Sequence, residues 1–212
     1  MNFDDLRRRM VERQIAARGV NDPRVLDAMA AVPRHAFVTP EHLDAAYEDR
    51  PLPIGYSQTI SQPYIVAYMV EQLRLPAAAR VLEIGTGCGY QTAVLAHIAQ
   101  HVWSIEIVAA LADRARATLG ALGIETVTIR AGDGYGGWPD AAPFDGIVLA
   151  AAPDHVPPAL ADQLAVGGRL VLPVGAGEQE LRVLTRTGDG TTEDRLLPVR
   201  FVPLVSRSPE RP

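Results

Sequence analysis

The stretch that decides the fold is Val81-Leu82-Glu83-Ile84-Gly85-Thr86-Gly87-Cys88-Gly89-Tyr90. Its first four residues are apolar apart from Glu83, which is typical of a short buried strand, and helical spacing begins after Gly89. Three glycines within five positions permit a tight backbone turn and the close approach of a ligand, because no β-carbon is in the way. We therefore predict a strand, a glycine turn and a helix, with a ligand site at the turn.

The spacing of these glycines distinguishes two kinds of cofactor site. A dinucleotide site uses the pattern G-x-G-x-x-G and places the pyrophosphate on the helix N-terminus. Here the third glycine comes one place early and Tyr90 fills the expected position, which disfavours NAD and FAD. The G-x-G-x-G spacing fits S-adenosylmethionine, which has no pyrophosphate and can lay its amino-acid and ribose portions over the loop. A purely structural turn is the alternative that the loop alone leaves open.

Two acidic residues farther along the chain extend this candidate site. Glu106 ends the next predicted strand, about 20 residues beyond the loop, where a carboxylate can accept hydrogen bonds from both ribose hydroxyls. Asp133 follows the third strand within Gly132-Asp133-Gly134 and can accept from an adenine amino group. Ordinary strand-end and turn residues are the alternatives, since Asp-Gly is a common turn pair. Because ligands of open α/β sheets bind at the carboxyl ends of strands, we expect these features to form one site.

The pattern around this stretch predicts an α/β fold with a doubly wound, mostly parallel sheet. Short apolar runs alternate with helical periodicity between residues 80 and 174, which implies parallel strands joined by right-handed crossovers. The turn-rich Gly188-Asp189-Gly190 then separates two apolar runs, 181–187 and 196–204, which we expect to form an antiparallel hairpin at one edge. The other expected strands are residues 81–84, 102–105, 126–129, 144–150 and 169–174, and the expected helices between them are residues 91–98, 109–122 and 158–164.

Two short helices are predicted at the start of the chain. Apolar residues at helical spacing indicate a helix over residues 3–17, which Gly19 ends. Asp22-Pro23 then supplies a cap and a first-turn proline for a second helix, which ends at Pro33. No period persists over residues 40–63, so we expect a long loop there, and a loop of this length in a compact domain is more often functional than not.

The composition excludes several chemistries. All 20 residues counted as Lys or Arg are Arg, so Schiff-base catalysis, a lysine base and the lysine of a phosphate-binding loop are excluded. The 212 residues, 48% of them hydrophobic, suit one globular domain, and the net charge of -5 argues against a nucleic-acid partner. Cys88 is the only cysteine, and the five histidines lack metal-ligand spacing, so we expect neither a disulfide nor a metal site. A charged start and the lack of a membrane-length apolar run lead us to expect a cytoplasmic protein, which we take to be a monomer.

With these residues in view, nearly the whole chain resembles the protein-L-isoaspartate O-methyltransferases. The most specific segments are Q-T-I-S-Q-P at residues 58–63 and F-V-P-L at residues 201–204, since the glycine loop alone would indicate only a methyltransferase. One departure from the family's pattern is Cys88, where we expect serine in most relatives, and we interpret this small side chain as a packing residue. Further matching segments are residues 13–15, 32–38, 46–47, 51–55, 81–90, 132–134, 167–170 and 172–175.

The resemblance implies a fold and a set of residue roles. The fold would be a Rossmann-like, seven-stranded class I methyltransferase core, with N-terminal helices over the site and an altered order of the last strands. Ser61 would be the active-site hydroxyl and would contact the substrate, together with a final segment that comprises Val202, Pro203, Leu204 and Val205. The residues expected to hold S-adenosylmethionine are Gln58, Thr59, Ile60, Glu83, Gly85, Thr86, Gly87, Gly89, Glu106, Ile107, Gly132, Asp133 and Gly134.

The reaction implied by the resemblance is methyl transfer from S-adenosylmethionine to the free carboxylate of L-isoaspartyl residues in damaged proteins and peptides. The products would be a methyl ester and S-adenosylhomocysteine, and the role would be protein repair. Because a free Asp side chain titrates near pH 4, the acceptor is already ionised at neutral pH and no general base is required. Within one domain over residues 1–212, we assign residues 1–62 to the N-terminal helices and active-site loop, 63–175 to the cofactor-binding core and 176–212 to the C-terminal strands.

Two other functions stay open at this point. One is a relative that methylates an aspartate in a single dedicated peptide, although 212 residues leave little room for an extra substrate-binding segment. The other is a binding protein that senses S-adenosylmethionine without turning it over, and the intact Thr59-Ile60-Ser61 argues against it.

Overall fold

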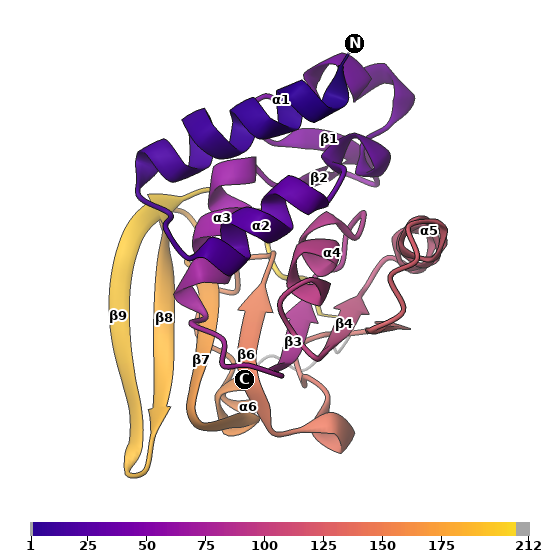
Figure 1. The fold of residues 1–212 in the computed structure, drawn as a ribbon. Coiled ribbons are helices and arrows are strands. Elements are labelled where there is room, and N and C mark those ends of the chain that lie inside the picture. Colours follow the sequence, from indigo (N-terminus) through magenta and orange to yellow (C-terminus); the bar gives the residue numbers. More distant parts are fainter. Residues whose placement is uncertain (1, 207–212) are drawn as a thin grey trace.

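The computed structural model describes residues 2–206, and within them a sheet of seven strands is covered by helices on both faces (Figure 1). The strands lie in the order β5-β4-β3-β6-β7-β8-β9. Strands β3 to β7 are parallel, and β8 runs antiparallel to both β7 and β9. This arrangement confirms the predicted α/β fold with a C-terminal hairpin. The bounds are Arg80–Ile84 (β3), His101–Glu106 (β4), Val127–Ala131 (β5), Phe144–Leu149 (β6), Leu164–Val174 (β7), Gln179–Thr187 (β8) and Gly190–Val199 (β9).

Two apolar clusters, one on each face of the sheet, form the core. Successive strand residues point to opposite faces, so Val81 packs in the cluster under α2 to α5, whereas Leu82 packs in the cluster with Leu160 of α6. The helix bounds are Phe3–Arg9 (α1), Pro23–Ala31 (α2), Pro63–Gln72 (α3), Tyr90–Ala96 (α4), Ala109–Ala121 (α5) and Pro158–Asp162 (α6). In the part of the chain that the structure describes, no helix has both the length and the apolar character needed to cross a bilayer.

The strand order reverses at β3, which lies between β4 and β6. Backbone hydrogen bonds draw the carboxyl ends of these strands together: the Gly85 amide donates to the Ile105 carbonyl at 2.8 Å, and the Ala150 amide donates to the Ile84 carbonyl at 2.9 Å. Such a reversal point is where open α/β sheets bind their ligands. Figure 1 shows the N-terminal helices above these strand ends.

The predicted N-terminal helices are confirmed. The first continues from α1 through a π-helical stretch, Met10–Ile15, and a 3₁₀ turn, Ala16–Arg18, and it ends at Gly19 with φ +98°. Asp22 caps α2 by accepting a hydrogen bond from the backbone amide of Arg24. The end of the first helix and the start of the second therefore follow from the residue types that the sequence places there.

The prediction of an irregular loop over residues 40–63 was wrong. This segment holds a 3₁₀ helix, Pro40–Ala45, and a hairpin made of Leu52–Gly55 (β1) and Gln58–Ile60 (β2). The inward positions Leu52 and Ile54 are fully buried, but two strands of four and three residues are too short to display a period. A two-stranded ribbon also tolerates proline, because both of its strands are edge strands whose outward-facing amides have no sheet partner.

The predicted second strand of the C-terminal hairpin was misplaced. We expected residues 196–204, but β9 ends at Val199 and residues 200–206 leave the sheet edge. This segment, the C-terminal strap, crosses to the carboxyl ends of the central strands, where the Ala152 amide donates to the Val202 carbonyl and the Leu204 amide donates to the Ala152 carbonyl, both at 2.8 Å. The first half of the predicted strand therefore lies in β9, but its second half pairs with the loop after β6 instead of with β8.

Candidate active site

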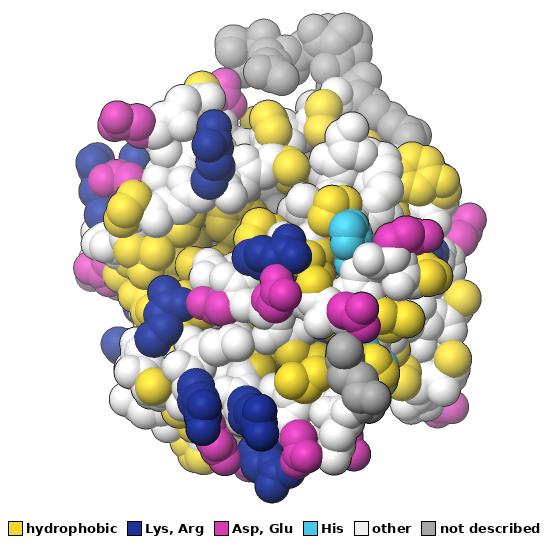
Figure 2. All heavy atoms as spheres, turned by 90° about the horizontal axis from the view of Figure 1, so that it is seen from above, with side chains coloured by type: hydrophobic (Ala, Val, Ile, Leu, Met, Phe, Trp, Pro, Cys, Tyr) yellow, Lys and Arg dark blue, Asp and Glu magenta, His cyan; other side chains and the backbone are white. Residues whose placement is uncertain are grey.

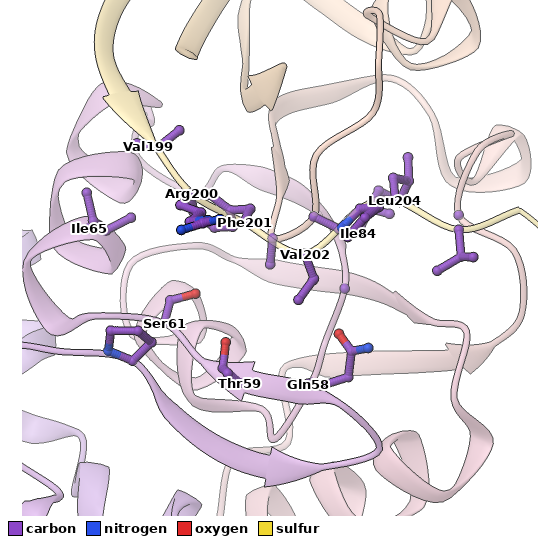
Figure 3. A pocket seen from close by; sticks show the side chains of 18 of the residues that line it. Gln58, Thr59, Ser61, Ile65, Ile84, Val199, Arg200, Phe201, Val202 and Leu204 are labelled. Atoms are coloured by element: carbon purple, nitrogen blue, oxygen red, sulfur yellow. The ribbon is translucent and has the colours of Figure 1, made fainter. Parts of the chain in front are cut away.

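A cavity of about 760 Å³ opens at the carboxyl edge of the sheet (Figure 3). Its volume is within the range of small-molecule sites. Three walls enclose it: the hairpin and α3, the ends of the central strands, and the C-terminal strap. The lining residues are Pro51, Gln58, Thr59, Ser61, Gln62 and Ile65 on the first wall, Ile84, Gly85, Gly87, Ile105, Glu106, Ile107, Gly134, Ala150 and Ala151 on the second, and residues 198–205 on the third.

The glycine loop, residues 85–89, adopts a backbone that only glycine takes readily. The φ angles are +96° at Gly85, +55° at Gly87 and +92° at Gly89. Gly85 and Gly87 line the cavity, and a β-carbon at Gly85 would lie 3.3 Å from the Ala150 β-carbon. Gly89 does not line it, because this glycine faces α5, where a β-carbon would lie 3.3 Å from that of Ala115. Two glycines thus shape the ligand surface and the third allows close helix packing.

Glu106 joins the end of β4 to the glycine loop. One carboxylate oxygen accepts from the Gly87 amide at 2.8 Å and the other accepts from the Val108 amide at 2.9 Å. The side chain is 4% exposed and lines the cavity, as does Ile107. The predicted acid therefore stands at the cavity floor with fixed orientation.

Glu83 lies behind the cavity wall instead of on it. Its side chain is fully buried and accepts from Thr92 at 2.5 Å, from Ser104 at 2.7 Å and from Gln91 at 3.1 Å. The Ser104 hydroxyl in turn lies 2.5 Å from the hydroxyl of Thr86, which is also buried, so the carboxyl group contacts the loop through one intermediate. Burial raises the pKa of Glu83 from 4.5 to about 7, although the three hydrogen bonds oppose the shift.

The segment after β5 brings one of its three predicted residues to the cavity. Gly134 lines it, and a β-carbon there would lie 2.4 Å from the Ile84 side chain, so only glycine fits. Asp133 accepts from the Tyr135 amide at 2.9 Å and from the Ser206 hydroxyl of the strap at 2.5 Å. Gly132 is used structurally, since its amide donates to the Glu106 carbonyl at 2.9 Å.

The hairpin places Ser61 opposite the strap. Figure 3 shows Ser61 and Thr59 on the opposite side of the cavity from the strap, with the Thr59 hydroxyl directed toward it. Gln58 also lines the cavity, whereas Ile60 is 3% exposed and packs into the core. On the strap side, the four predicted residues, 202–205, all line the cavity.

An acid that the sequence analysis missed supports the Ser61 segment from behind. Asp49 accepts from Arg18 at 2.6 Å and from the Gln62 side chain at 2.8 Å, and its other oxygen accepts from the Tyr64 amide at 3.3 Å. Arg18 also stacks over the Tyr64 ring, with its guanidinium carbon 3.5 Å from the ring centroid. Asp49 carries no motif and lies in a segment without periodicity, so no sequence signal marked it.

Comparison with known proteins agrees with this architecture. A protein-L-isoaspartate O-methyltransferase of Gloeobacter violaceus is 57% identical over 203 residues, which cover 95% of this chain and 99% of that one. A solved structure of the same name is 30% identical and has a TM-score of 0.85. The match covers 93% of this chain and 65% of that longer chain. A Plasmodium falciparum structure named for the same activity, in complex with S-adenosyl-L-homocysteine, has a TM-score of 0.84 at 26% identity and covers 98% of this chain and 100% of that chain.

The strand order and the cavity at its reversal point define a Rossmann-like methyltransferase. The family model for protein-L-isoaspartate(D-aspartate) O-methyltransferase matches residues 6–209. The chain therefore belongs to the protein-L-isoaspartate(D-aspartate) O-methyltransferase family.

Proposed function

We propose that this chain transfers a methyl group from S-adenosylmethionine to the free carboxylate of L-isoaspartyl residues in damaged proteins and peptides. The products are the methyl ester and S-adenosylhomocysteine, and the biological role is repair. The observation that carries the proposal is that Ser61, the glycine loop and Glu106 line one cavity.

The cavity residues fit an S-adenosyl group. Gly85 and Gly87 leave the floor free of β-carbons, and Glu106 presents an anionic acceptor suited to ribose hydroxyls. Ile84, Ile105 and Ile107 supply an apolar surface beside it. When bound, S-adenosylmethionine supplies an electrophilic methyl carbon. We assign its binding to these residues together with Gln58, Thr59 and Gly134, with Ile60, Thr86, Gly89 and Gly132 as supports, Asp133 as an acceptor for the adenine amino group and Glu83 as a positioning residue.

The reaction asks the chain to orient a carboxylate, not to ionise it. The acceptor is deprotonated at neutral pH, and no histidine lines the described cavity to act as a base. Ser61 can donate a hydrogen bond to one carboxylate oxygen and direct the other toward the methyl donor, which is a contribution of proximity and alignment. Val202, Pro203, Leu204 and Val205 form an apolar wall that holds the peptide and excludes water.

One assay tests the proposal against its rivals. The protein is incubated with methyl-labelled S-adenosylmethionine and two matched peptides, one with isoaspartate and one with normal aspartate. We expect base-labile methyl ester on the isoaspartyl peptide alone. Label on the normal aspartyl peptide, or on neither, would contradict the proposal, and the second outcome would favour a protein that only binds S-adenosylmethionine.

The Glu106→Ala variant is expected to weaken S-adenosylhomocysteine binding by about 10- to 100-fold, because it removes charged hydrogen bonds to the ribose. It also releases the Gly87 amide that shapes the loop. Isothermal titration calorimetry measures the change, with Glu125→Ala, an exposed acid outside the cavity lining, as the control. Unchanged affinity in the Glu106 variant would refute the ribose assignment.

The Asp49→Asn variant is expected to lower kcat/KM for an isoaspartyl peptide about tenfold, because small displacements of an orienting group are costly. Asparagine offers a single acceptor oxygen and no charge for Arg18, so the segment around Ser61 and Gln62 loses its anchor. Steady-state kinetics on this variant and on Glu48→Gln, whose residue makes only an exposed pair with Arg50, isolate the effect. Equal activity in both variants would show that Asp49 does not position the site.

We also propose that the protein works as a cytoplasmic monomer of one domain, without a nucleic-acid partner. Its single, unpaired cysteine, Cys88, suits a reducing compartment. On the face seen in Figure 2, Arg side chains lie among Asp and Glu side chains, and the net charge is -5. Such a surface has little attraction for a phosphate backbone.

A further inference from the structure

Arg200, the first residue of the C-terminal strap, takes no part in the proposed cofactor binding or methyl transfer. It is exposed and lines the cavity, where it is the sole cationic residue among the described lining residues. Within residues 2–206 it makes neither an ion pair nor a hydrogen bond. Figure 3 shows it at the end of the cavity occupied by Ser61, Ile65 and Val199, away from Ile84.

The backbone that carries Arg200 is fixed on both sides. Val199 pairs with Gln179 at the end of the hairpin sheet. The Gln179 side chain then holds Phe201, since its oxygen accepts from the Phe201 amide at 2.6 Å and its nitrogen donates to the Phe201 carbonyl at 3.1 Å. Arg200 is therefore presented from an anchored segment, which limits the ordering needed when a ligand binds.

Two acids of the adjoining segments are already paired with other arginines, and Glu106, which also lines the cavity, is bound by two backbone amides. Glu180, which pairs with Pro198 across the strands, lies 3.5 Å from Arg195 and 3.8 Å from Arg182. Asp49, beneath the Ser61 segment, is paired with Arg18 at 2.6 Å. The charge of Arg200 is thus left for a group that enters the cavity.

We propose that Arg200 binds an acidic side chain of the substrate peptide next to the isoaspartyl residue, so that this enzyme prefers acidic damage sites. This inference rests on the proposed function. The reacting carboxylate is the poorer partner, because a guanidinium on its oxygens would reduce its nucleophilicity, and Ser61 suffices to orient it. A neighbouring Asp or Glu has no such conflict, and its planar carboxylate matches the guanidinium fork.

The test uses isoaspartyl peptides that differ only in the adjacent residue, which is Glu, Gln or Lys, placed before or after the isoaspartate. For the wild-type enzyme, kcat/KM is expected to be highest with Glu, lower with Gln and lowest with Lys. The value for the Glu peptide should exceed that for the Gln peptide roughly three- to tenfold, through a lower KM, and this ratio should shrink in about 0.5 M salt. In Arg200→Gln this ratio should fall to about one, and in Arg200→Glu the ranking should reverse. Arg116→Gln, on α5, is the matched control and should keep the wild-type ranking.

Three results would overturn the inference. Equal kcat/KM values of the wild-type enzyme for the Glu and Gln peptides would show that it has no preference for acidic sites. The same ratio in wild type and Arg200→Gln would assign it to other residues, and a loss of S-adenosylhomocysteine affinity in Arg200→Gln by calorimetry would place Arg200 on the cofactor. Failure to methylate any isoaspartyl peptide would instead refute the proposed function on which the inference rests.

Discussion

The Ser61→Ala variant is expected to lower kcat for an isoaspartyl peptide by about 10²- to 10³-fold, the size expected when one orienting donor is lost. Its affinity for S-adenosylhomocysteine should stay within about twofold of wild type, because the residues to which we assign cofactor binding do not include Ser61. Single-turnover kinetics give the first quantity and calorimetry gives the second.

The physical reason for this separation is the position of Ser61 directly after β2, across the cavity from the strap. In the proposed reaction its hydroxyl aligns the acceptor, which matters in the transition state, and takes little part in ground-state binding of the cofactor. Ser57→Ala is the matched control, since Ser57 is an exposed serine at the turn of the same hairpin and does not line the cavity. Equal losses of turnover and cofactor affinity in Ser61→Ala would contradict the orienting role.

The sheet could be predicted because its signals are local. The apolar run at residues 144–150 became β6, Phe144–Leu149, and the run at 102–105 became β4, His101–Glu106. Most residues of both strands are buried, so each strand reads as a mostly apolar segment, interrupted by Ser104 in β4 and by Asp145 and Gly146 in β6. The glycine spacing likewise predicted the loop, since the positive φ angles at Gly85 and Gly87 exclude most other residues.

Other parts depend on tertiary contacts that no local pattern encodes. The strap residues 200–206 have the composition of a strand, but their partner is Ala152, and only the fold brings the two together. Arg34 is completely buried, with its Nε donating to the Ala46 carbonyl at 2.8 Å and its guanidinium carbon 4.8 Å from the Tyr90 ring centroid. An arginine in a sequence predicts an exposed residue, because burial of a charge is costly, so such a site is seen only in the structure.

For Glu83 the motif was located correctly, but the role predicted from it was incomplete. The sequence places this acid in a buried strand next to the glycine loop, and for that reason we predicted that it binds the cofactor. The strand alternation, however, aims the side chain at α4, where Gln91 and Thr92 receive it. Its effect on the loop therefore passes through Ser104 and Thr86, and its most direct consequence is for stability.

The Glu83→Gln variant is expected to change how stability depends on pH. The folded-state pKa of Glu83 is raised from 4.5 to about 7, so the folded protein retains a proton that the unfolded chain releases. Relative to the variant, wild-type stability should be greatest below pH 4.5, fall as the pH rises through the window up to 7, and be flat above it. The shift corresponds to about 3 kcal/mol at 1.36 kcal/mol per pKa unit.

Urea unfolding at several pH values between 4.5 and 8 measures this window for both proteins. The free energy of unfolding of Glu83→Gln minus that of wild type should rise by about 3 kcal/mol across it, because glutamine has no proton to lose. The glutamine oxygen can still accept from Thr92 and Ser104, and its NH2 group can donate to Gln91 once the Gln91 amide turns to present its oxygen, so the variant mainly removes the titrating proton. Glu125→Gln, at an exposed position, should give a curve parallel to wild type. Parallel curves for Glu83→Gln as well would mean that the Glu83 carboxyl group is already ionised in the folded protein, because a carboxyl group whose pKa is not raised does not alter the pH dependence of stability in this range.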